Sequence, residues 1–197
     1  MSRGVYALLI AQFLTAFADN AILFTAIAIV LHAPTTAPWY VPALQSAFLV
    51  AFVVLAPMVG PLADSRPKSH ILMLGNILKA AGVTLMLLGV EPIAAYGLVG
   101  IGAAVYGPAK YGILPEIVDH TRLVRANGWI EGSTIVAIIV GTVVGARIAD
   151  ASIHGAMIAV IACYALSLLA TFFVPRVAPT RRLVIDPRHF FQMMRTL

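Results

Sequence analysis

Six long apolar stretches follow one another along this chain, and they constrain its fold more than any other feature of the sequence. A bilayer core is about 30 Å thick, so a helix that rises about 1.5 Å per residue needs roughly 20 apolar residues to cross it. Each stretch reaches that length. They cover Val5–Leu31, Tyr40–Ala63, Ile71–Val90, Pro92–Leu114, Asn127–Ala149 and Ile153–Val174.

The composition places these stretches in lipid. Hydrophobic residues make up 61% of the chain and charged residues only 11%. A soluble fold of this length would lack the polar surface that keeps a protein dissolved. The sequence therefore predicts an all-α membrane protein in which residues 1–174 form a bundle of six transmembrane helices.

The basic residues predict how the bundle is oriented. Ten of the 13 Lys and Arg residues lie at the chain ends or in two alternate loops, and cytoplasmic loops carry an excess of Lys and Arg. We therefore expect both termini in the cytoplasm and residues 175–197 to form a basic cytoplasmic linker. The net charge of +5 is first a topology signal, and no nucleic-acid partner is expected. The ten residues are Arg3, Arg66, Lys68, Arg122, Arg125, Arg176, Arg181, Arg182, Arg188 and Arg195.

A polar stripe interrupts the first apolar stretch. Gln12 and Thr15 precede Asp19 by seven and four residues, which puts all three on one helical face. A charge at the bilayer centre costs about 2.5 to 3.5 kcal/mol on insertion scales, so something should compensate it. Either the stripe lines a substrate cavity in which Asp19 contacts the substrate or a coupling cation, or Asp19 pairs with a neighbouring helix for assembly.

Four further charged residues lie within the apolar stretches, and Arg147, near the outer end of the fifth, is assigned no role. Lys79 can bind a ligand or bond to Asp19. Lys110, near the cytoplasmic end of the fourth stretch, can bind a ligand or extend to the lipid headgroups. Glu131 enters the fifth stretch at the same end and can pair with Lys110 or with a nearby loop arginine. The candidate substrate-binding residues are Gln12, Thr15, Asp19, Asn20, Lys79 and Lys110.

A short motif, GPLADSRPK, occupies residues 60–68 in the predicted cytoplasmic turn between the second and third stretches. A carboxylate at a helix end can hold an opposing helix N-terminus or an arginine, while flanking basic residues stay at the headgroup level. An ion pair that breaks and reforms suits a gate. We therefore predict a cytoplasmic latch, whose residues are Gly60, Asp64, Arg66, Lys68 and Glu131.

This motif resembles the loop signature that links the second and third helices of the major facilitator superfamily. Three further segments narrow the resemblance to the bacterial lysophospholipid transporters, a family of the inner membrane within that superfamily. The likeness runs from the first stretch through the sixth. The segments are Ala11–Ala21 (AQFLTAFADNA), Gly107–Glu116 (GPAKYGILPE), and Ala126–Gly128 followed by Glu131, Ser133 and Thr134.

The resemblance implies a multi-pass inner-membrane flippase without a cofactor. Such a protein would move lysophosphatidylethanolamine and lysophosphatidylglycerol from the outer to the inner leaflet, where an acyltransferase and acyl carrier protein synthetase restores the second chain. Superfamily transporters have two six-helix halves around a midplane site. This chain corresponds to the first half, so we expect a truncated chain whose missing C-terminal half supplies the opposite wall, or a half-size protein that dimerises. Within the chain, the first three and last three helices should form inverted repeats.

Other classes stay open. An exporter or importer of another amphiphilic molecule would have the same architecture. A non-transporting assembly subunit would explain Gly141 and Gly145, because small residues let membrane helices pack closely. A membrane enzyme would need clustered histidines and acids, whereas the five histidines are dispersed over different loops and ends. The sequence therefore favours a transporter over an enzyme.

Overall fold

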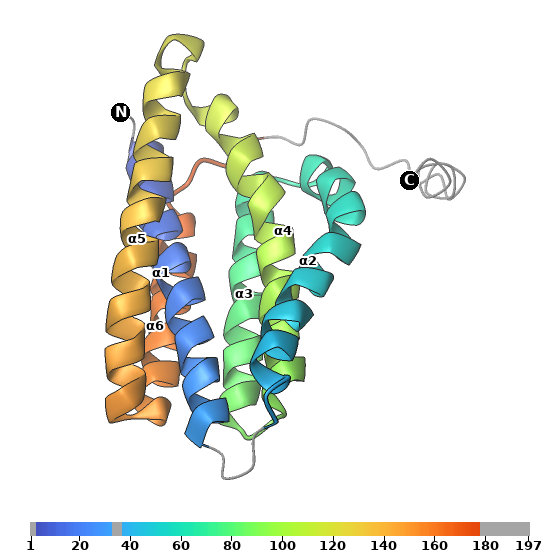
Figure 1. Cartoon of the computed structure of the whole chain (residues 1–197). Coiled ribbons are helices and arrows are strands. Elements are labelled where there is room, and N and C mark those ends of the chain that lie inside the picture. The colour runs from blue at the N-terminus through green and yellow to red at the C-terminus, as the bar shows by residue number, and fades with distance from the viewer. Residues whose placement is uncertain (1–2, 33–36, 178–197) are drawn as a thin grey trace, which may run out of the picture.

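The computed structural model describes residues 3–32 and 37–177, apart from the side chains of residues 56, 57 and 64, and this part of the chain is all-helical (Figure 1). Each α-helix lies over one of the six predicted stretches. The largest difference is at the start of the fifth, which begins at Leu123 rather than Asn127. The elements are α1 (Arg3–His32), α2 (Tyr40–Ser65), α3 (Lys68–Leu87), α4 (Pro92–Ile117), the 3-10 helix η1 (His120–Arg122), α5 (Leu123–Ala151) and α6 (Ile153–Thr171).

Several helix ends follow local sequence signals. The Glu91 carboxylate accepts a hydrogen bond of 3.0 Å from a backbone N–H in the first turn of α4, and Pro92 takes the first helical position. The Ser152 hydroxyl caps α6 in the same way, also at 3.0 Å. Gly89 follows α3 with a φ of +86°, a left-handed conformation that favours glycine. The short turns between helices therefore have residues suited to their backbone geometry.

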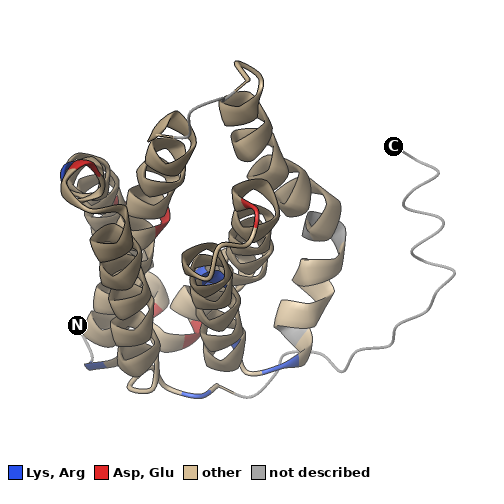
Figure 2. Ribbon diagram, turned by 90° about the horizontal axis from the view of Figure 1, so that it is seen from below, with Lys and Arg blue, Asp and Glu red and all other residues tan. Residues whose placement is uncertain are grey.

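The helices pack as two groups of three. The helix α4 packs mainly against α2 and α3, and α1 packs mainly against α5 and α6, while α3 and α6 join the two groups. Contacts between α1 and α4, and between α4 and α5, are few. Figure 2 shows the bundle nearly end-on, with few charged positions along the helices. The first helix of each half of the chain thus packs against the second and third helices of the other half.

Glycines bring two of these helix pairs into backbone contact. A Cβ atom added to Gly145 would lie 2.5 Å from the Cα of Ala21, and one added to Gly102 would lie 2.6 Å from the carbonyl oxygen of Gly75. Such distances are too short for any side chain. Gly145 and Gly141 therefore bring α5 close to α1, a close contact whose partner helix the sequence did not predict, and Gly102 does the same for α4 on α3.

Five helices of the described chain are long and apolar enough to cross a membrane, namely α1, α3, α4, α5 and α6. In α2 the described apolar segment is Tyr40–Leu55, which is shorter than a full span. The all-helical class is therefore confirmed for the described residues. The sixth span and the cytoplasmic position of the termini stay predictions. The predicted linker lies outside the described residues after residue 177.

Candidate functional site

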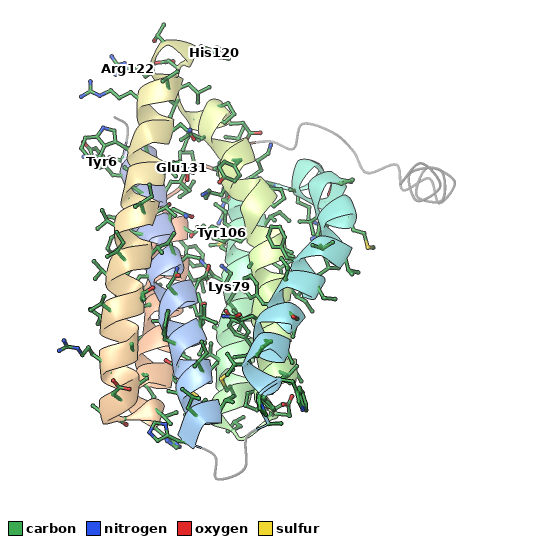
Figure 3. All side chains as sticks on the ribbon, in the orientation of Figure 1. Tyr6, Lys79, Tyr106, His120, Arg122 and Glu131 are labelled. Carbon is green, nitrogen blue, oxygen red and sulfur yellow. The ribbon has the colours of Figure 1, made fainter. Side chains whose placement is uncertain are left out.

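Asp19, in the middle of α1, forms an ion pair with Lys79 of α3. The Lys79 Nζ atom donates to Asp19 Oδ2 at 2.7 Å, and the Tyr164 hydroxyl of α6 donates to Asp19 Oδ1 at 2.7 Å. The Lys79 ammonium also lies 4.9 Å from the ring centre of Tyr106 and 5.9 Å from that of Tyr164. Figure 3 shows Lys79 and Tyr106 near each other inside the bundle. A carboxylate from α1 thus joins α3 and α6, and two aromatic rings stabilise the ammonium.

One turn before Asp19, the buried Thr15 joins a second polar cluster. Its hydroxyl lies 3.1 Å from Asn76 Oδ1 and 2.8 Å from Ser167 Oγ. The Asn76 amide donates to Ser167 at 2.9 Å, and Ser167 donates to the Ala11 carbonyl oxygen at 2.8 Å. The hydroxyl and amide groups of this cluster satisfy one another across α1, α3 and α6. Thr15 therefore faces other helices, and its contacts are those of a packing residue.

The other polar residues of α1 differ from each other. The Gln12 amide nitrogen donates to the Thr134 hydroxyl of α5 at 3.0 Å, but Gln12 Oε1 is buried without a hydrogen-bond partner among the described residues. The Asn20 amide nitrogen donates to the Ala16 carbonyl oxygen of its own helix at 2.8 Å. Gln12 therefore keeps an acceptor available inside the bundle, whereas the Asn20 nitrogen is already bonded.

A second ion pair joins α4 to α5. The Lys110 Nζ atom donates to Glu131 Oε1 at 3.2 Å and lies 4.2 Å from the ring centre of Tyr111. These two helices have few other contacts, so the pair bridges surfaces that are otherwise hardly packed together. From the sequence, Glu131 could pair with Lys110 or with a nearby loop arginine. In the structure it pairs with Lys110.

In both pairs the carboxylate is the accessible partner. The side chain of Lys79 is 1% exposed and that of Asp19 is 25% exposed, while Lys110 is 8% and Glu131 39% exposed. A cationic group that approaches either pair can therefore reach the carboxylate without breaking into the packed side of the bundle. An anionic group can reach the ammonium only after the pair opens. The arrangement suits a ligand that carries both signs of charge.

The predicted cytoplasmic latch is described in part. Arg66 follows α2 and is exposed. Lys68, expected in the loop, is instead the first residue of α3, and its buried side chain pairs with Glu116 of α4. Gly60 lies within α2 with open space beside it. The side chain of Asp64 lies outside the described residues, so its partner stays a prediction.

Sequence reasoning missed the residues that complete these contacts. Tyr164 and Ser167 are three residues apart, on one face of a mostly apolar α6, which is a weak but usable signal. Tyr106 gives no such signal, because a tyrosine in a membrane helix is usually taken as a packing residue. Its hydroxyl is buried without a hydrogen-bond partner among the described residues.

Similarity to characterised proteins agrees with this architecture. The chain is similar to the lysophospholipid transporter LplT of Photorhabdus laumondii subsp. laumondii, with 45% identity over 182 residues, or 92% of this chain and 46% of that protein. It is also similar to LplT of Salmonella paratyphi B, with 44% identity over 195 residues, or 96% of this chain and 48% of that protein. The chain thus spans about half the length of these curated relatives.

A solved structure matches the fold alone. The crystal structure of a POT family transporter in complex with 5-aminolevulinic acid superposes with a TM-score of 0.81 at 15% identity, and the match covers 100% of this chain and 44% of that one. The sequence profile of the Major Facilitator Superfamily matches residues 8–192. Because that match covers most of the chain and the helices adopt a transporter fold, this chain belongs to the major facilitator superfamily.

Proposed function

We propose that this chain forms part of a lysophospholipid transporter of the bacterial inner membrane. The observation that carries the proposal is the 45% identity to a lysophospholipid transporter over 92% of the chain. The transporter moves lysophosphatidylethanolamine and lysophosphatidylglycerol from the outer to the inner leaflet. There, a partner enzyme that is both an acyltransferase and an acyl carrier protein synthetase adds the second acyl chain.

The two ion pairs support binding of the headgroup. The ammonium of an ethanolamine headgroup binds the accessible carboxylate of Glu131 at one stage of transport and that of Asp19, deeper in the bundle, at another. Once Glu131 turns to that ammonium, Lys110 is free to bind the phosphate. Lys79, whose side chain is 1% exposed, contributes mainly by holding Asp19 in position. The single acyl tail stays in contact with apolar surfaces and lipid.

The other candidate residues have supporting roles in this proposal. The side-chain amide oxygen of Gln12, which has no partner among the described residues, offers a further hydrogen-bond acceptor for the headgroup, between α1 and α5. Thr15 fixes α1 against α3 and α6. Asn20 follows Asp19 directly, and its side-chain amide oxygen can accept a hydrogen bond from the ligand. The site therefore centres on α1 and α4, with Lys79 contributed by α3 and Glu131 by α5.

The gate lies at the end of the bundle that carries the basic loops. Lys68 and Glu116 hold α3 to α4 there, and the pair of Lys110 and Glu131 bridges α4 and α5. In our proposal the second of these pairs opens and closes during transport, together with Asp64 and Arg66 in the α2–α3 turn. Figure 1 shows that the N-terminal end of α1, the α2–α3 turn and the α4–α5 turn lie at the same end, which supports a cytoplasmic position for both termini.

The packing also supports two inverted repeats, α1–α3 and α4–α6. The helix α1 packs on α5 and α6 as α4 packs on α2 and α3, and α3 contacts α6 between the groups. When two three-helix units are related by a pseudo-two-fold axis in the membrane plane, the first helix of each unit is expected to pack against the other unit in this way. The headgroup site between α1 and α4 then lies close to that axis.

The test is uptake of labelled lysophosphatidylethanolamine by spheroplasts that lack their own importer and express this protein from its whole gene. We expect uptake well above the background of spheroplasts with an empty vector. Asp19→Asn should lower uptake at least tenfold because the neutral amide cannot form an ion pair with the substrate ammonium. Absence of uptake from a well-folded wild-type protein would contradict the proposed substrate and favour another amphiphile.

Two controls separate binding from assembly. Arg147→Gln changes a charge near the far end of α5, away from both ion pairs, and should leave uptake and membrane abundance unchanged. Thr15→Val removes the two packing hydrogen bonds to Asn76 and Ser167 and should lower uptake only in proportion to abundance. If Asp19→Asn also lowered uptake only in proportion to abundance, Asp19 would be an assembly residue.

A further inference from the structure

A cavity of about 960 Å³ lies outside the two ion pairs. It is enclosed by the N-terminal end of α1, the C-terminal end of α4, η1 and the first turns of α5. Figure 3 shows Tyr6 and Arg122 on the same side of the bundle, near its upper end. The cavity therefore opens where the predicted cytoplasmic leaflet would have its headgroups.

The lining of this cavity is divided by polarity. Arg122 and Arg125 contribute positive charge toward its outer end, while Val5 and Leu9 form an apolar wall along α1. Tyr6 and Trp129, each 56% exposed, also line it. Exposed aromatic side chains of this kind are typical of the membrane interface. An apolar wall beneath a cationic rim matches a lipid better than it matches a soluble anion.

The two arginines have guanidinium groups available for a ligand. Among the described residues, neither guanidinium group takes part in a hydrogen bond or ion pair. The Arg122 side chain does not cap α5, and the first turn of α5 contains no acidic residue. The N-terminal dipole of a long helix therefore adds to their positive potential. Two acids also line the cavity, but Glu116 pairs with Lys68, so Asp119 is the one carboxylate set against both arginines.

We propose that this cavity binds the headgroup of an anionic phospholipid from the adjacent leaflet. The phosphate lies between Arg122 and Arg125, which can bind its oxygens in a bidentate manner. The glycerol backbone and first methylene groups lie against Tyr6, Trp129 and Leu9. This lipid is a bound component of the protein and not its cargo, because the site contains neither Asp19 nor Lys110. The inference therefore does not depend on which substrate is transported.

The test is site-specific photo-crosslinking. The protein expressed from its whole gene, with Tyr6→p-benzoylphenylalanine, is reconstituted in phosphatidylcholine vesicles that contain a small fraction of tritiated phosphatidylglycerol. We expect labelling that saturates as the phosphatidylglycerol fraction rises. Each basic residue near an anionic surface contributes roughly 1 kcal/mol, so Arg122→Gln/Arg125→Gln should weaken the apparent affinity about 25-fold.

The matched control removes the same charge elsewhere at this end. Arg3→Gln/Arg176→Gln should leave labelling unchanged, since neither residue lines the cavity. An equal loss in both double variants would overturn the proposal in favour of general surface charge. Suppression of labelling by millimolar inorganic phosphate would overturn it in favour of a soluble phosphate ligand.

If the double variant Arg122→Gln/Arg125→Gln folds poorly, the two single variants test the site instead. Arg122→Gln and Arg125→Gln, tested separately, should each weaken the apparent affinity about fivefold. Uptake of lysophosphatidylethanolamine, measured on the same variants, reports on the transport function independently. Unchanged labelling in both single variants would overturn the proposed site whether or not the protein transports lysolipids.

Discussion

The two ion pairs between helices differ in how firmly the structure holds them. Asp19 and Lys79 are 2.7 Å apart, and Tyr164 binds the second carboxylate oxygen at the same distance. Lys110 and Glu131 are 3.2 Å apart, and Glu131 is 39% exposed. The first pair joins α1 to α3, which have few direct contacts but both pack against α6, whereas the second bridges α4 and α5, which have few contacts with each other.

This difference indicates different roles for the same chemistry. Burial makes an unpaired charge costly, so the Asp19 pair resists opening and acts as a fixed joint. Solvent or headgroups can replace the partner of an exposed carboxylate at little cost, so the Lys110 pair can open and close. The three predictions that follow test whether stability depends mainly on the first pair, and whether transport needs the second pair although stability does not.

The largest expected effect on stability comes from Lys79→Met. It leaves the Asp19 carboxylate without its ammonium, and removing one partner of a buried pair typically costs about 3 to 5 kcal/mol. Thermal unfolding in detergent micelles should show a clear fall in Tm, with less folded protein in the membrane. The double variant Asp19→Leu/Lys79→Met should recover much of that stability, since it removes both charges. A wild-type Tm for Lys79→Met would contradict the description of this pair as a fixed joint.

A smaller effect is expected from Tyr164→Phe. This change removes the hydrogen bond of 2.7 Å to Asp19 Oδ1 but keeps the ring beside Lys79. Hydrogen bonds to charged groups contribute about 1.5 to 3 kcal/mol in proteins, and bonds between membrane helices contribute less, so we expect a loss of about 1 to 2 kcal/mol. Reversible unfolding in mixed micelles measures it. Tyr106→Phe is the matched control, because the hydroxyl of Tyr106 has no partner among the described residues, and it should not destabilise the protein.

The smallest change in stability is expected from Glu131→Gln. An exposed ion pair contributes between zero and about 1 kcal/mol, so Tm should stay close to that of the wild type. Uptake of lysophosphatidylethanolamine should nevertheless fall, because Lys110 loses the partner that sets its position between transport steps. Loss of stability equal to that of Lys79→Met would show that the two pairs do not differ in kind.

The sequence predicted the helices well because their cause is local. A run of about 20 apolar residues must form a helix in lipid, whatever its neighbours are, since every backbone N–H and C=O needs a partner. Gly141 and Gly145 were correctly expected at a close helix contact. The start of α3 was predicted less well, because Lys68 was taken as a loop residue. Its pairing with Glu116 lets the helix begin earlier with the charge buried.

The candidate site was predicted in its residues but not in its connections. The spacing of Gln12, Thr15 and Asp19 put them on one face of α1, and the structure keeps them there. That face meets three different helices, so Gln12 bonds to α5, Thr15 to α3 and α6, and Asp19 to α3 and α6. No spacing rule within one helix says which helix lies opposite. Tyr164 and Ser167 were missed for this reason.

By itself, the sequence determined that this chain is a bundle of apolar helices, where each helix lies, which end carries the basic residues, and to which superfamily the chain belongs. These properties follow from the length of apolar runs, from charge at their ends and from short motifs, all of which are local. Only the tertiary structure decided that Lys79 is buried against Asp19 while Glu131 stays accessible, and that Arg122 and Arg125, whose side chains have no partner among the described residues, line a cavity beside Trp129. Burial and pairing depend on which helices lie side by side, and that is set by the packing of the whole bundle.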